Sequence, residues 1–484
     1  MVRPGIVLTY LGRITILIGI AMLTCIPWSL FYQESDAAVI ALAAIITIAS
    51  GLFFSFFYGH REEGINYKEG FCVVTLGWVF ASLFGSLPYL FTGSLVSVPD
   101  AIFETVSGFT TTGATVITDV EALSHGILFW RSLTHWLGGM GIIALFVAIM
   151  AGLGARANQL FRAEVPGPVA DKVSPRIREN ARFLWLTYMI LSLGLFVLLA
   201  CFGMGIFDAM CHTFSTMATG GFSTKNSSIA YYSSPAIQWT IILFMFLSGA
   251  SFALHYRAYQ KRSLRLYGRN SEFVFYSFIT LVFAAIIFLS LGSPANLSQF
   301  EAHLRSSLFQ VVSIITTTGY VTENYDYWPA LAQGILFMAM FIGGCAGSTG
   351  GNIKPGRYLI LFYRAFIELR QMVHPRAVQP VKLSGRALDD ALVINVLQFF
   401  FLYIFILAVG TICLTVEGLD VFSSLTGTAA CLGNIGPGFG ALGPTENFAL
   451  LSAVNKVILS MIMLIGRLEI YPVLLMFIPA FWRE

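Results

Sequence analysis

Ten long runs of apolar residues divide this chain, and each is long enough to cross a lipid bilayer as a helix. A spanning helix needs about 20 predominantly apolar residues. Because 57% of the 484 residues are hydrophobic and only 11% are charged, the chain has too little charge to cover a soluble globule of this size. We therefore predict an all-α polytopic membrane protein. The ten expected spans are 8–32, 38–58, 70–92, 127–153, 183–204, 236–257, 273–293, 331–363 (interrupted), 391–415 and 452–478.

Four shorter, semi-apolar segments lie between alternate pairs of these runs, and each leads into a loop rich in threonine and glycine. The segments are too short to cross a bilayer, so we expect four re-entrant pore helices near 100–111, 208–219, 306–317 and 423–434. Four copies of one loop indicate four walls of one pore. The loop residues are Thr111, Thr112 and Gly113; Thr219, Gly220 and Gly221; Thr317, Thr318 and Gly319; and Asn434, Ile435 and Gly436.

Alignment of the loops on their four central glycines brings further residues into register. Six positions earlier stand Ser107, Ser215 and Ser313, with Ala430 in the fourth copy. Thirteen positions earlier stand residue types that cap helix N-termini, namely Asp100, Asp208, Ser306 and Ser423. We expect an N-terminal helix pair at 1–66 and then four pseudo-repeated units of helix, pore helix, loop and helix around one pore. The units are 67–165, 166–265, 266–375 and 376–484.

The basic residues indicate the orientation of the chain. They gather in short loops at 61–68, 156–182, 257–269 and 364–386, whereas the opposite loops carry mainly acids. By the positive-inside rule the basic side is cytoplasmic. The Thr/Gly loops then open towards the outside and both termini lie inside. The net charge of +3 is therefore a topology signal, and we expect contacts with lipid headgroups and no nucleic-acid partner.

The loops have the chemistry of a cation pore. A half-helix that ends inside the membrane points its C-terminal carbonyls, and the negative end of its dipole, at whatever lies beyond. Irregular backbone at that depth is tolerated only where it is buried in protein or lines a water-filled cavity. Four loops of carbonyl and hydroxyl oxygens can replace the hydration shell of a monovalent cation, whereas a divalent ion would favour carboxylates, which the loops lack. The alternative is that the small residues only let helices pack closely.

The four loops resemble the selectivity-filter loops of the Trk/Ktr/HKT superfamily of potassium transporters. The resemblance covers nearly the whole chain, and the N-terminal pair and further motifs at 162–168, 343–351, 374–377 and 466–469 are similar to the bacterial TrkH family. It implies potassium uptake across the bacterial inner membrane, with potassium bound at the twelve loop residues. Some members that pass sodium have serine at the position of Gly113. Because Gly220 and the pair Asn434 and Ile435 depart from the Thr-Thr-Gly pattern, we expect an uneven ring.

The eighth apolar run is broken by glycines. Glycine in a helix interior costs about 1 kcal/mol relative to alanine, so we expect a flexible intramembrane loop, or alternatively a plain helix kink. The spacing of a phosphate-binding loop is absent. By resemblance the loop is a gate beneath the filter. Its residues are Gly343, Gly344, Gly347, Ser348, Thr349, Gly350 and Gly351.

Arg467 lies in the last apolar run, where an unpaired guanidinium facing lipid would be costly. We expect it to face the bundle interior, and by resemblance to place a positive charge in the pore beside the loop at 343–351. The alternative is a local pair with Glu469 or a snorkelling position near the inner end, which is disfavoured because the apolar run continues for another ten residues beyond Arg467. Lys354 either adds to the same barrier or begins the cytoplasmic end of the broken helix.

The resemblance also implies a homodimer docked on a cytosolic, nucleotide-binding TrkA ring, and no organic cofactor in this chain. A second interpretation is a symporter that couples potassium to H⁺ or Na⁺, for which Glu104 and His135 are the main ionisable candidates in the path. A membrane enzyme is disfavoured, because the chain has no nucleophile and base arrangement, no HExxH and no CxxC among its seven cysteines.

Overall fold

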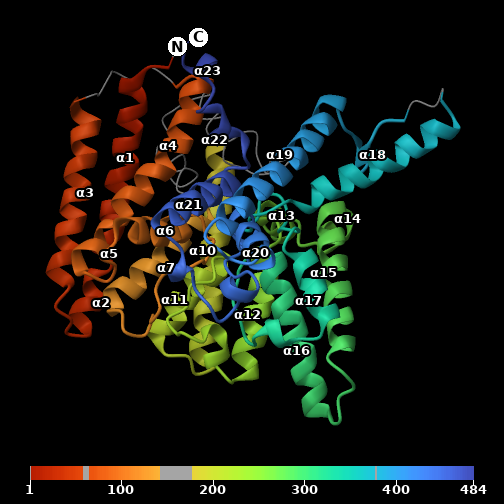
Figure 1. Cartoon of the computed structure of the whole chain (residues 1–484), viewed down its shortest axis with the longest axis horizontal. Helices are drawn as coiled ribbons and strands as arrows, with labels where there is room; N and C mark the ends of the chain where they lie inside the picture. The colour runs from red at the N-terminus through yellow and green to blue at the C-terminus, as the bar shows by residue number, and fades with distance from the viewer. Residues whose placement is uncertain (1, 58–64, 142–176, 376–378, 484) are drawn as a thin grey trace.

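The computed structural model describes residues 2–57, 65–141, 177–375 and 379–483, and almost all of its regular elements are helices (Figure 1). In these residues the only sheet is the antiparallel pair β1 (Lys382–Leu383) and β2 (Arg386–Ala387). The two chain ends lie at the same end of the molecule. The boundary expected at 165, the motif at 162–168 and the basic residues at 61, 156–176 and 376 lie outside the described residues.

Within the described ranges, six helical segments are long and apolar enough to cross a membrane. The chain is therefore a helical, membrane-type protein, as predicted, while the count of ten spans stays a prediction. A seventh span results if α12 (Pro235–Ser248) and α13 (Phe252–Gln260), which meet at 93°, form one broken span. The six are α1 (Pro4–Leu23) with α2 (Ile26–Phe31), α3 (Ala37–Phe57), α4 (Tyr67–Gly85) with α5 (Leu87–Thr92), α10 (Ile177–Cys201), α15 (Ser271–Ser290) and α19 (Asp390–Thr415).

The second helix of each expected unit ends partway along its apolar run. These helices are α7 (His125–Gly139), α12, α17 (Ala330–Ala339) and α21 (Ala453–Arg467). The interruption expected in the eighth run is present between α17 and α18 (Pro355–Val373). The runs at 236–257 and 452–478 are not continuous helices, because the first bends between α12 and α13 and the helix of the second ends at Arg467.

Each unexpected break has a local cause. At the bend after α12, the carbonyl of Gly249 accepts a hydrogen bond from the N–H of Cys345 at 2.7 Å, and the N–H of Phe252 donates to the carbonyl of Gly347 at 2.9 Å. The backbone there therefore pairs with the distant glycine-rich loop instead of continuing its own helix. After α21, Glu469 and Ile470 have φ of 55° and 69°, values that end a right-handed helix.

The four short helices are α6 (Val98–Phe109), α11 (Ile206–Met217), α16 (Leu297–Ile315) and α20 (Val421–Leu432). The predicted N-caps are wrong, since Asp100, Asp208 and Ser423 are the third residues of their helices and Ser306 is the tenth of α16. The N-cap positions are Ser97, Gly205, Asn296 and Asp420. α16 also begins nine residues earlier than the segment expected at 306–317, because its N-cap is Asn296.

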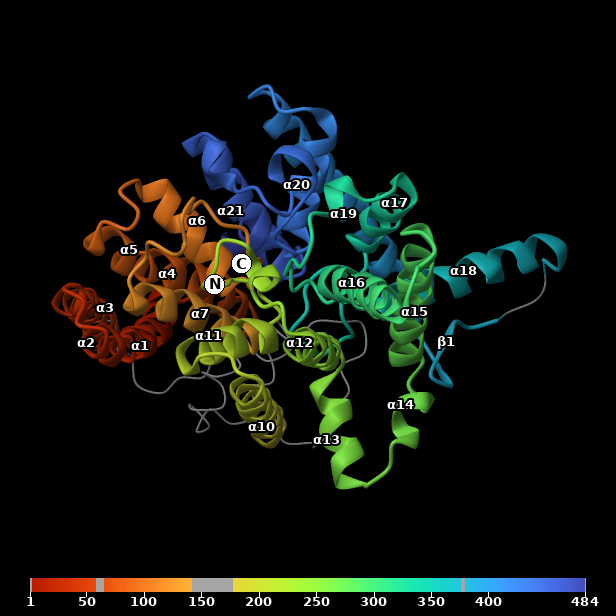
Figure 2. The ribbon, with the colours of Figure 1, turned by 90° about the horizontal axis from the view of Figure 1, so that it is seen from below.

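Three of the four short helices pack against the second helix of another expected unit. α11 packs on α7 of the unit before it, α16 on α12, and α6 on α21 of the last unit. Seen from below, α4–α7, α10–α12, α15–α18 and α19–α21 surround a common centre, with α1–α3 outside (Figure 2). The remaining helices are α14 (Arg265–Arg269), α22 (Tyr471–Leu475) and α23 (Pro479–Arg483), with short 3-10 turns at Ser228–Tyr231, Tyr325–Tyr327, Gly440–Leu442 and Phe448–Leu450.

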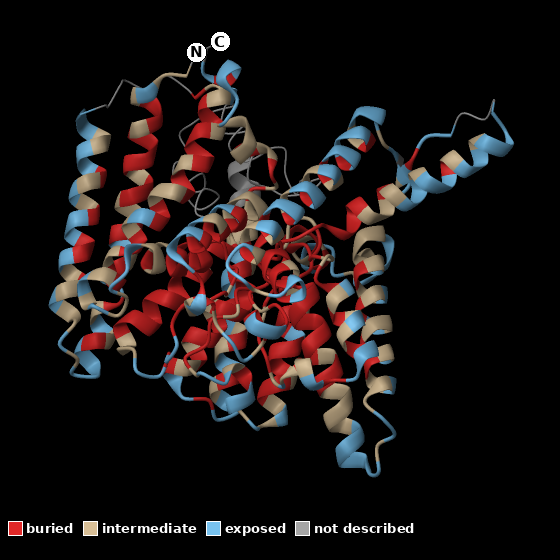
Figure 3. Cartoon of the chain, viewed as in Figure 1, coloured by how far each residue is buried: buried red, intermediate tan, exposed pale blue. Residues whose placement is uncertain are grey.

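Burial follows this arrangement. Buried residues concentrate at the centre, where the short helices and their loops meet (Figure 3). The outer helices carry exposed apolar side chains, such as Phe53 on α3, Leu193 on α10, Phe278 on α15 and Phe401 on α19. Large apolar side chains turned outward on helices of spanning length suit a bilayer, in which the surroundings are as apolar as the side chains.

Candidate functional site

The four short helices end in the same way. Two positions before each central glycine the backbone has a positive φ, of 54° at Thr111 and Thr219, 59° at Thr317 and 55° at Asn434. The following residue donates its N–H to the carbonyl six positions before the glycine, at 2.8 or 2.9 Å. This is the Schellman ending of a helix, which usually places glycine at the left-handed position. A β-branched threonine there is strained by about 1–3 kcal/mol, and such strain clusters at functional sites.

The central glycines join the four loops into a closed ring. Each has a positive φ, from 77° to 103°. A Cβ atom added to any of them would come within 2.7 Å of a carbonyl oxygen of another loop. The contact passes from the first loop to the second, the third, the fourth and back to the first, so a side chain at this position would push the walls apart. The pairs, glycine first, are Gly113 and Gly220, Gly221 and Thr318, Gly319 and Ile435, and Gly436 and Thr112.

The loop carbonyls are free of protein donors. In each loop, the carbonyl oxygens of the central glycine and of the two residues before it accept no hydrogen bond from the part of the chain that the structure describes. The N–H groups of the residues just before the central glycines donate to carbonyls at the ends of the helices, whereas the loop carbonyl oxygens receive no such bond within the described part of the chain. A buried carbonyl without a partner costs about 1–3 kcal/mol. A ring of twelve such groups is therefore stable only with water or a cation among them.

Two loops brace themselves with threonine hydroxyls. In the first loop the hydroxyls of Thr110 and Thr112 lie 2.7 Å apart, and in the third loop those of Thr316 and Thr318 lie 2.7 Å apart. All four side chains are buried. These pairs connect the last residue of each helix region to the residue before the central glycine, so the hydroxyls support the backbone.

The other two loops are braced from outside. In the second loop, a Cβ atom added to Gly220 would lie 2.5 Å from Cγ of His135 on α7, so the imidazole ring occupies the space of the missing side chain. In the fourth loop, Asn434 Nδ2 donates to Thr112 Oγ1 and to the Met463 carbonyl, both at 3.0 Å. The expected unevenness is thus found in the side chains, while the backbone path is alike in all four loops.

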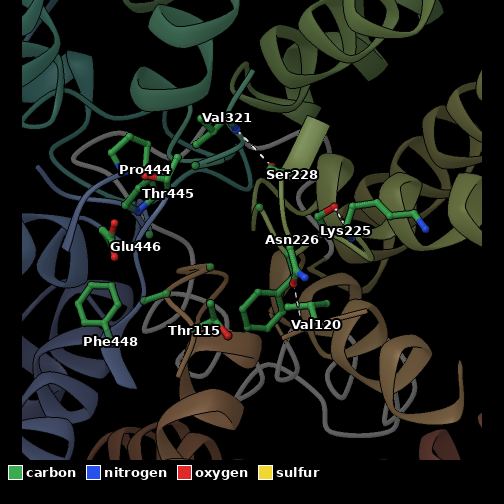
Figure 4. A pocket seen from close by; sticks show the side chains of 18 of the residues that line it. Thr115, Val120, Lys225, Asn226, Ser228, Val321, Pro444, Thr445, Glu446 and Phe448 are labelled. Carbon is green, nitrogen blue, oxygen red and sulfur yellow. Dashed lines mark hydrogen bonds between the residues drawn. The ribbon is translucent and has the colours of Figure 1, made fainter. Parts of the chain in front are cut away.

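A cavity of about 110 Å³ lies on one side of the ring, and all four central glycines line it (Figure 4). The rest of its wall comes from the segments that follow the loops, which are tied together by the bonds from Val120 N to Asn226 Oδ1 at 2.7 Å and from Val321 N to Ser228 Oγ at 3.3 Å. Glu446 also lines the cavity, and the Lys225 side chain extends away from its centre towards Tyr231. The cavity gives the ring an opening on this side.

A buried ion pair supports the first two loops from behind. Arg131 Nε on α7 donates to Glu104 Oε1 on α6 at 2.7 Å, and both side chains are almost fully buried. Glu104 also accepts from Thr115 Oγ1 at 3.0 Å, while Arg131 Nη1 donates to the Ser223 carbonyl at 3.1 Å. The pair therefore connects the chain just after the first loop to the chain just after the second. Sequence reasoning noted Glu104 but missed Arg131, whose charge inside an apolar run was the available signal.

The glycine-rich segment at 343–351 lies against the other side of the ring. Gly351 N donates to Thr317 Oγ1 at 2.8 Å, and Thr219 Oγ1 donates to Thr349 Oγ1 at 3.3 Å. A Cβ atom added to Gly351 would lie 2.7 Å from the Gly433 carbonyl of the fourth loop. The segment thus touches three of the four loops at or next to their strained positions.

The rest of the segment is held by its surroundings. Gly343 N donates to the Ile353 carbonyl at 3.0 Å, and Ser348 N to the Cys345 carbonyl at 3.1 Å. A Cβ atom added to Gly344 would lie 2.9 Å from the Gly249 carbonyl, and one added to Gly350 would lie 3.0 Å from the Thr316 carbonyl. Gly347 has φ of 76°. Small residues are therefore required along the whole segment, which packs as a folded loop and not as a kinked helix.

A carboxylate connects the same segment to the start of α18. Glu272, at the start of α15, accepts hydrogen bonds from Ala346 N at 3.0 Å and Gly356 N at 3.1 Å. Ala346 lies within the segment and Gly356 in the first turn of α18. Nothing in the sequence linked Glu272 to this segment, because the two are far apart along the chain.

Two cations bind carbonyl groups of the segment. Arg467 donates to the Thr349 carbonyl at 2.8 Å, and its other terminal nitrogen donates to the carbonyls at the end of α7, Gly138 at 2.7 Å and Gly139 at 3.1 Å. Lys354, which is 1% exposed, bonds to the Gly350 and Gly351 carbonyls and is also the N-cap residue of α18. Lys354 therefore lies at the start of α18 and against the glycine-rich segment, while its part in a barrier stays a prediction.

Arg467 lies at the end of its helix, close to Glu469 in the chain. The carboxylate of Glu469 pairs with Arg357, and its second oxygen has no hydrogen-bond partner in the described residues. α21 ends at Arg467, so the helix does not continue through the ten residues that were expected to follow. Arg467 faces inward, between the glycine-rich segment and α7.

The described residues contain no group of three or more His, Cys, Asp or Glu side chains placed to hold a metal ion. The seven cysteines, which all lie in the described ranges, form no disulfide. The oxygen ring is thus built from backbone, and a resident divalent or transition metal has no ligand cluster in these residues.

Comparison with known proteins gives a consistent result. A family model described as "TrkH: Cation transport protein" matches residues 35–484. Trk system potassium uptake protein TrkH of Salmonella typhimurium is 40% identical over 459 residues, 94% of each chain, and TrkH of Halomonas elongata is 37% identical over 99% of each chain. The crystal structure of the potassium transporter TrkH from Vibrio parahaemolyticus covers 99% of this chain and is itself covered completely, with a TM-score of 0.89 and 35% identity.

Proposed function

Because the chain belongs to the TrkH family of cation transport proteins, we propose that it carries potassium into the cell through a gated, potassium-selective pore in the bacterial inner membrane. The observation that carries this proposal is the closed ring of twelve loop carbonyl oxygens without protein donors. Relatives of 37–40% identity are named as potassium uptake proteins of the Trk system, which supports potassium as the ion.

The chemistry of the ring favours a monovalent ion. Its oxygens are neutral carbonyls, backed by hydroxyl and amide groups, and no carboxylate belongs to the four loops. Neutral oxygens suffice to replace the hydration shell of potassium, whereas Mg²⁺ and Ca²⁺ require charged ligands to offset their larger dehydration cost. The negative ends of four helix dipoles add attraction for a cation without fixing it permanently. Potassium is therefore the transported substrate, bound at Thr111–Gly113, Thr219–Gly221, Thr317–Gly319 and Asn434–Gly436.

The proposed architecture is four units, 67–165, 166–265, 266–375 and 376–484, around this one pore, behind the helix pair at 1–66. Ten spans result when each second helix, though broken, crosses the membrane once. The cyclic packing of α6, α11 and α16 on second helices of neighbouring units supports this division. With the basic loops in the cytoplasm, the cavity above the ring faces outward and both termini face inward.

The glycine-rich segment is the proposed gate. It lies directly against the inner side of the ring, where it blocks the path of an ion leaving the oxygens. Arg467 and Lys354 bind the carbonyls of Thr349, Gly350 and Gly351 and hold the segment in place. They also place two positive charges next to the segment, and positive charge opposes the passage of a cation. Opening then requires the segment to move and these bonds to break.

The proposed assembly is a homodimer in lipid, regulated by a cytosolic nucleotide-binding ring of the TrkA type. The relatives' names support it, because they describe subunits of a Trk system. The basic residues of α13 and α14 are Arg257, Arg265 and Arg269, and they supply a charged surface on the side where such a partner would dock.

A second candidate function is potassium symport with H⁺ or Na⁺. It is favoured by His135, a buried ring behind the second loop whose Nε2 has no hydrogen-bond partner among the described residues. Glu104 is less suited to proton transfer, because it is held in the ion pair with Arg131. Potassium flux that follows its own gradient alone, with no response to imposed pH or sodium gradients, would exclude symport.

The main test is ion flux into proteoliposomes of the purified protein, with and without the cytosolic partner. Uptake of a rubidium tracer should be inhibited by external potassium and only weakly by sodium. The partner, given its nucleotide, should change the rate and leave the ratio of rubidium to sodium flux unchanged. Equal uptake of sodium and rubidium would refute selectivity at the ring.

A further inference from the structure

The side chain of His135 on α7 lies where a side chain of residue 220 would be. A Cβ atom added to Gly220 would lie 2.5 Å from Cγ and 2.6 Å from Cε1 of the imidazole. Real Cβ atoms do not approach other atoms so closely. Gly220 is therefore glycine because His135 is there, and its φ is not in the left-handed region that would require glycine for conformational reasons.

The equivalent positions in the first and third loops carry threonine. Thr112 and Thr318 each bond a second threonine hydroxyl of their own loop at 2.7 Å. The second loop lacks both members of such a pair, because Ala218 stands at the other position. The second loop therefore has no pair of threonine hydroxyls, and the His135 side chain fills the space next to Gly220.

The imidazole is fixed on its remaining sides. Its ring stacks on Phe222 with centroids 4.1 Å apart and planes 18° from parallel, and Nδ1 lies 3.3 Å from Ser215 Oγ. Phe222 is in turn covered by the Arg131 guanidinium, 3.8 Å from its centroid. The ring is fully buried. The contacts on its other sides hold the imidazole against Gly220.

The residue that the imidazole contacts also provides a carbonyl of the ring. Gly220 supplies the oxygen that abuts Gly113 of the first loop, and its N–H donates to the Ser215 carbonyl at 2.8 Å. His135 thus contacts both the residue that provides the oxygen and the residue that anchors its N–H. We propose that His135 is a positioning residue for the second wall of the pore, and that the pair of Gly220 and His135 replaces a threonine in setting ion discrimination.

This inference rests on the proposed potassium-selective pore, so the test begins with the unaltered protein in proteoliposomes. The readout is the ratio of rubidium to sodium uptake, which loss of folded protein alone does not change. If the unaltered protein takes up both ions equally, the proposed function fails. If it discriminates, the variants decide the role of His135.

Four variants test the positioning role. His135→Ala removes the support, and the flux ratio should fall severalfold. His135→Phe keeps a planar ring against Gly220 while losing the contact with Ser215, and should retain most of the ratio. Gly220→Thr alone inserts a side chain into the ring of His135 and should lower the ratio or the yield of folded protein. The double variant His135→Ala with Gly220→Thr should recover towards the unaltered ratio, because the threonine then fills the vacated space.

A control on the same helix separates stability from positioning. Leu133 is a buried residue of α7 that belongs to the apolar cluster formed with α1 and α4. Leu133→Ala should lower the yield of folded protein and leave the flux ratio unchanged. An unaltered ratio in His135→Ala would overturn the inference, as would a double variant no more selective than the worse of its two single variants.

Discussion

Replacing Arg467 with alanine should raise cation flux if the glycine-rich segment at 343–351 is the gate that we propose, because Arg467 binds this segment. Of the three hydrogen bonds described above, the 2.8 Å bond to the Thr349 carbonyl is the one that must break when the segment moves. The bonds to Gly138 and Gly139 keep the guanidinium attached to α7. The arginine therefore links the proposed gate to the end of α7.

The size of the effect follows from that one bond. A hydrogen bond to a charged group contributes about 1.5–3 kcal/mol, and each 1.4 kcal/mol or so is a factor of about ten. Its loss should shift the balance between seated and displaced segment by roughly 10- to 150-fold. Flux should rise by up to the same factor where displacement limits the rate. Removal of the positive charge beside the path acts in the same direction.

The assay is rubidium uptake into proteoliposomes without the cytosolic partner, normalised to folded protein measured by size exclusion. Arg467→Lys keeps the charge and loses the bidentate fork, so its flux should lie between those of the unaltered protein and Arg467→Ala. Arg364 is a matched control, because it lies on α18 beyond the segment and pairs with Glu368. Arg364→Ala should leave flux unchanged. An Arg467→Ala protein with unchanged or lower flux would show that the bond to Thr349 does not limit opening.

Three further predictions concern the ring and its supports. Gly319→Ala places a methyl group against the Ile435 carbonyl and strains the backbone by about 1–2 kcal/mol, and the ratio of rubidium to sodium uptake should fall roughly 5- to 30-fold. Glu104→Gln leaves Arg131 buried without its carboxylate at a cost of about 3–5 kcal/mol; thermal unfolding in detergent should shift downward, and an unchanged midpoint would contradict the pairing. Glu272→Gln weakens the bonds to Ala346 in the glycine-rich segment and to Gly356 at the start of α18, so uptake without the partner should rise, while a rubidium to sodium ratio that also changed would count against an effect limited to the proposed gate.

The spacing of the four central glycines could be recognised from the sequence for a physical reason. Each glycine has a positive φ and lies against a carbonyl of another loop, so a side chain there is disfavoured both by the backbone conformation and by the lack of space. The requirement recurs at the same point of every unit and therefore leaves a regular signal. The run of glycines at 343–351 was visible for the same reason, since backbone approaches it closely along its length.

The helix ends and breaks were not predictable in this way. The bend between α12 and α13 contains one glycine and no proline, and it forms because Gly249 and Phe252 bond to a segment nearly a hundred residues later. Hydropathy records only that the residues are apolar. The N-caps were placed three residues too late in α6, α11 and α20, because acidic and hydroxyl residues also favour the first helical turn, where Asp100 and Asp208 lie.

The unevenness of the loops has a different meaning in the structure from the one that the sequence suggested. Thr112, Gly220, Thr318 and Ile435 are dissimilar side chains at one position, yet each contributes a carbonyl to the same ring, and each is preceded by a residue with φ between 54° and 59°. Proposed ion binding by carbonyls depends on the backbone conformation. The side chains can therefore differ, provided that each loop backbone is supported by some contact. These contacts are a pair of threonine hydroxyls in the first and third loops and the His135 imidazole in the second. In the fourth loop, the contact is the Asn434 side-chain amide, which bonds to Thr112 of the first loop. Because these braces differ in stiffness, substitutions behind the second and fourth loops should change selectivity by different amounts, even though the oxygens they support are chemically the same.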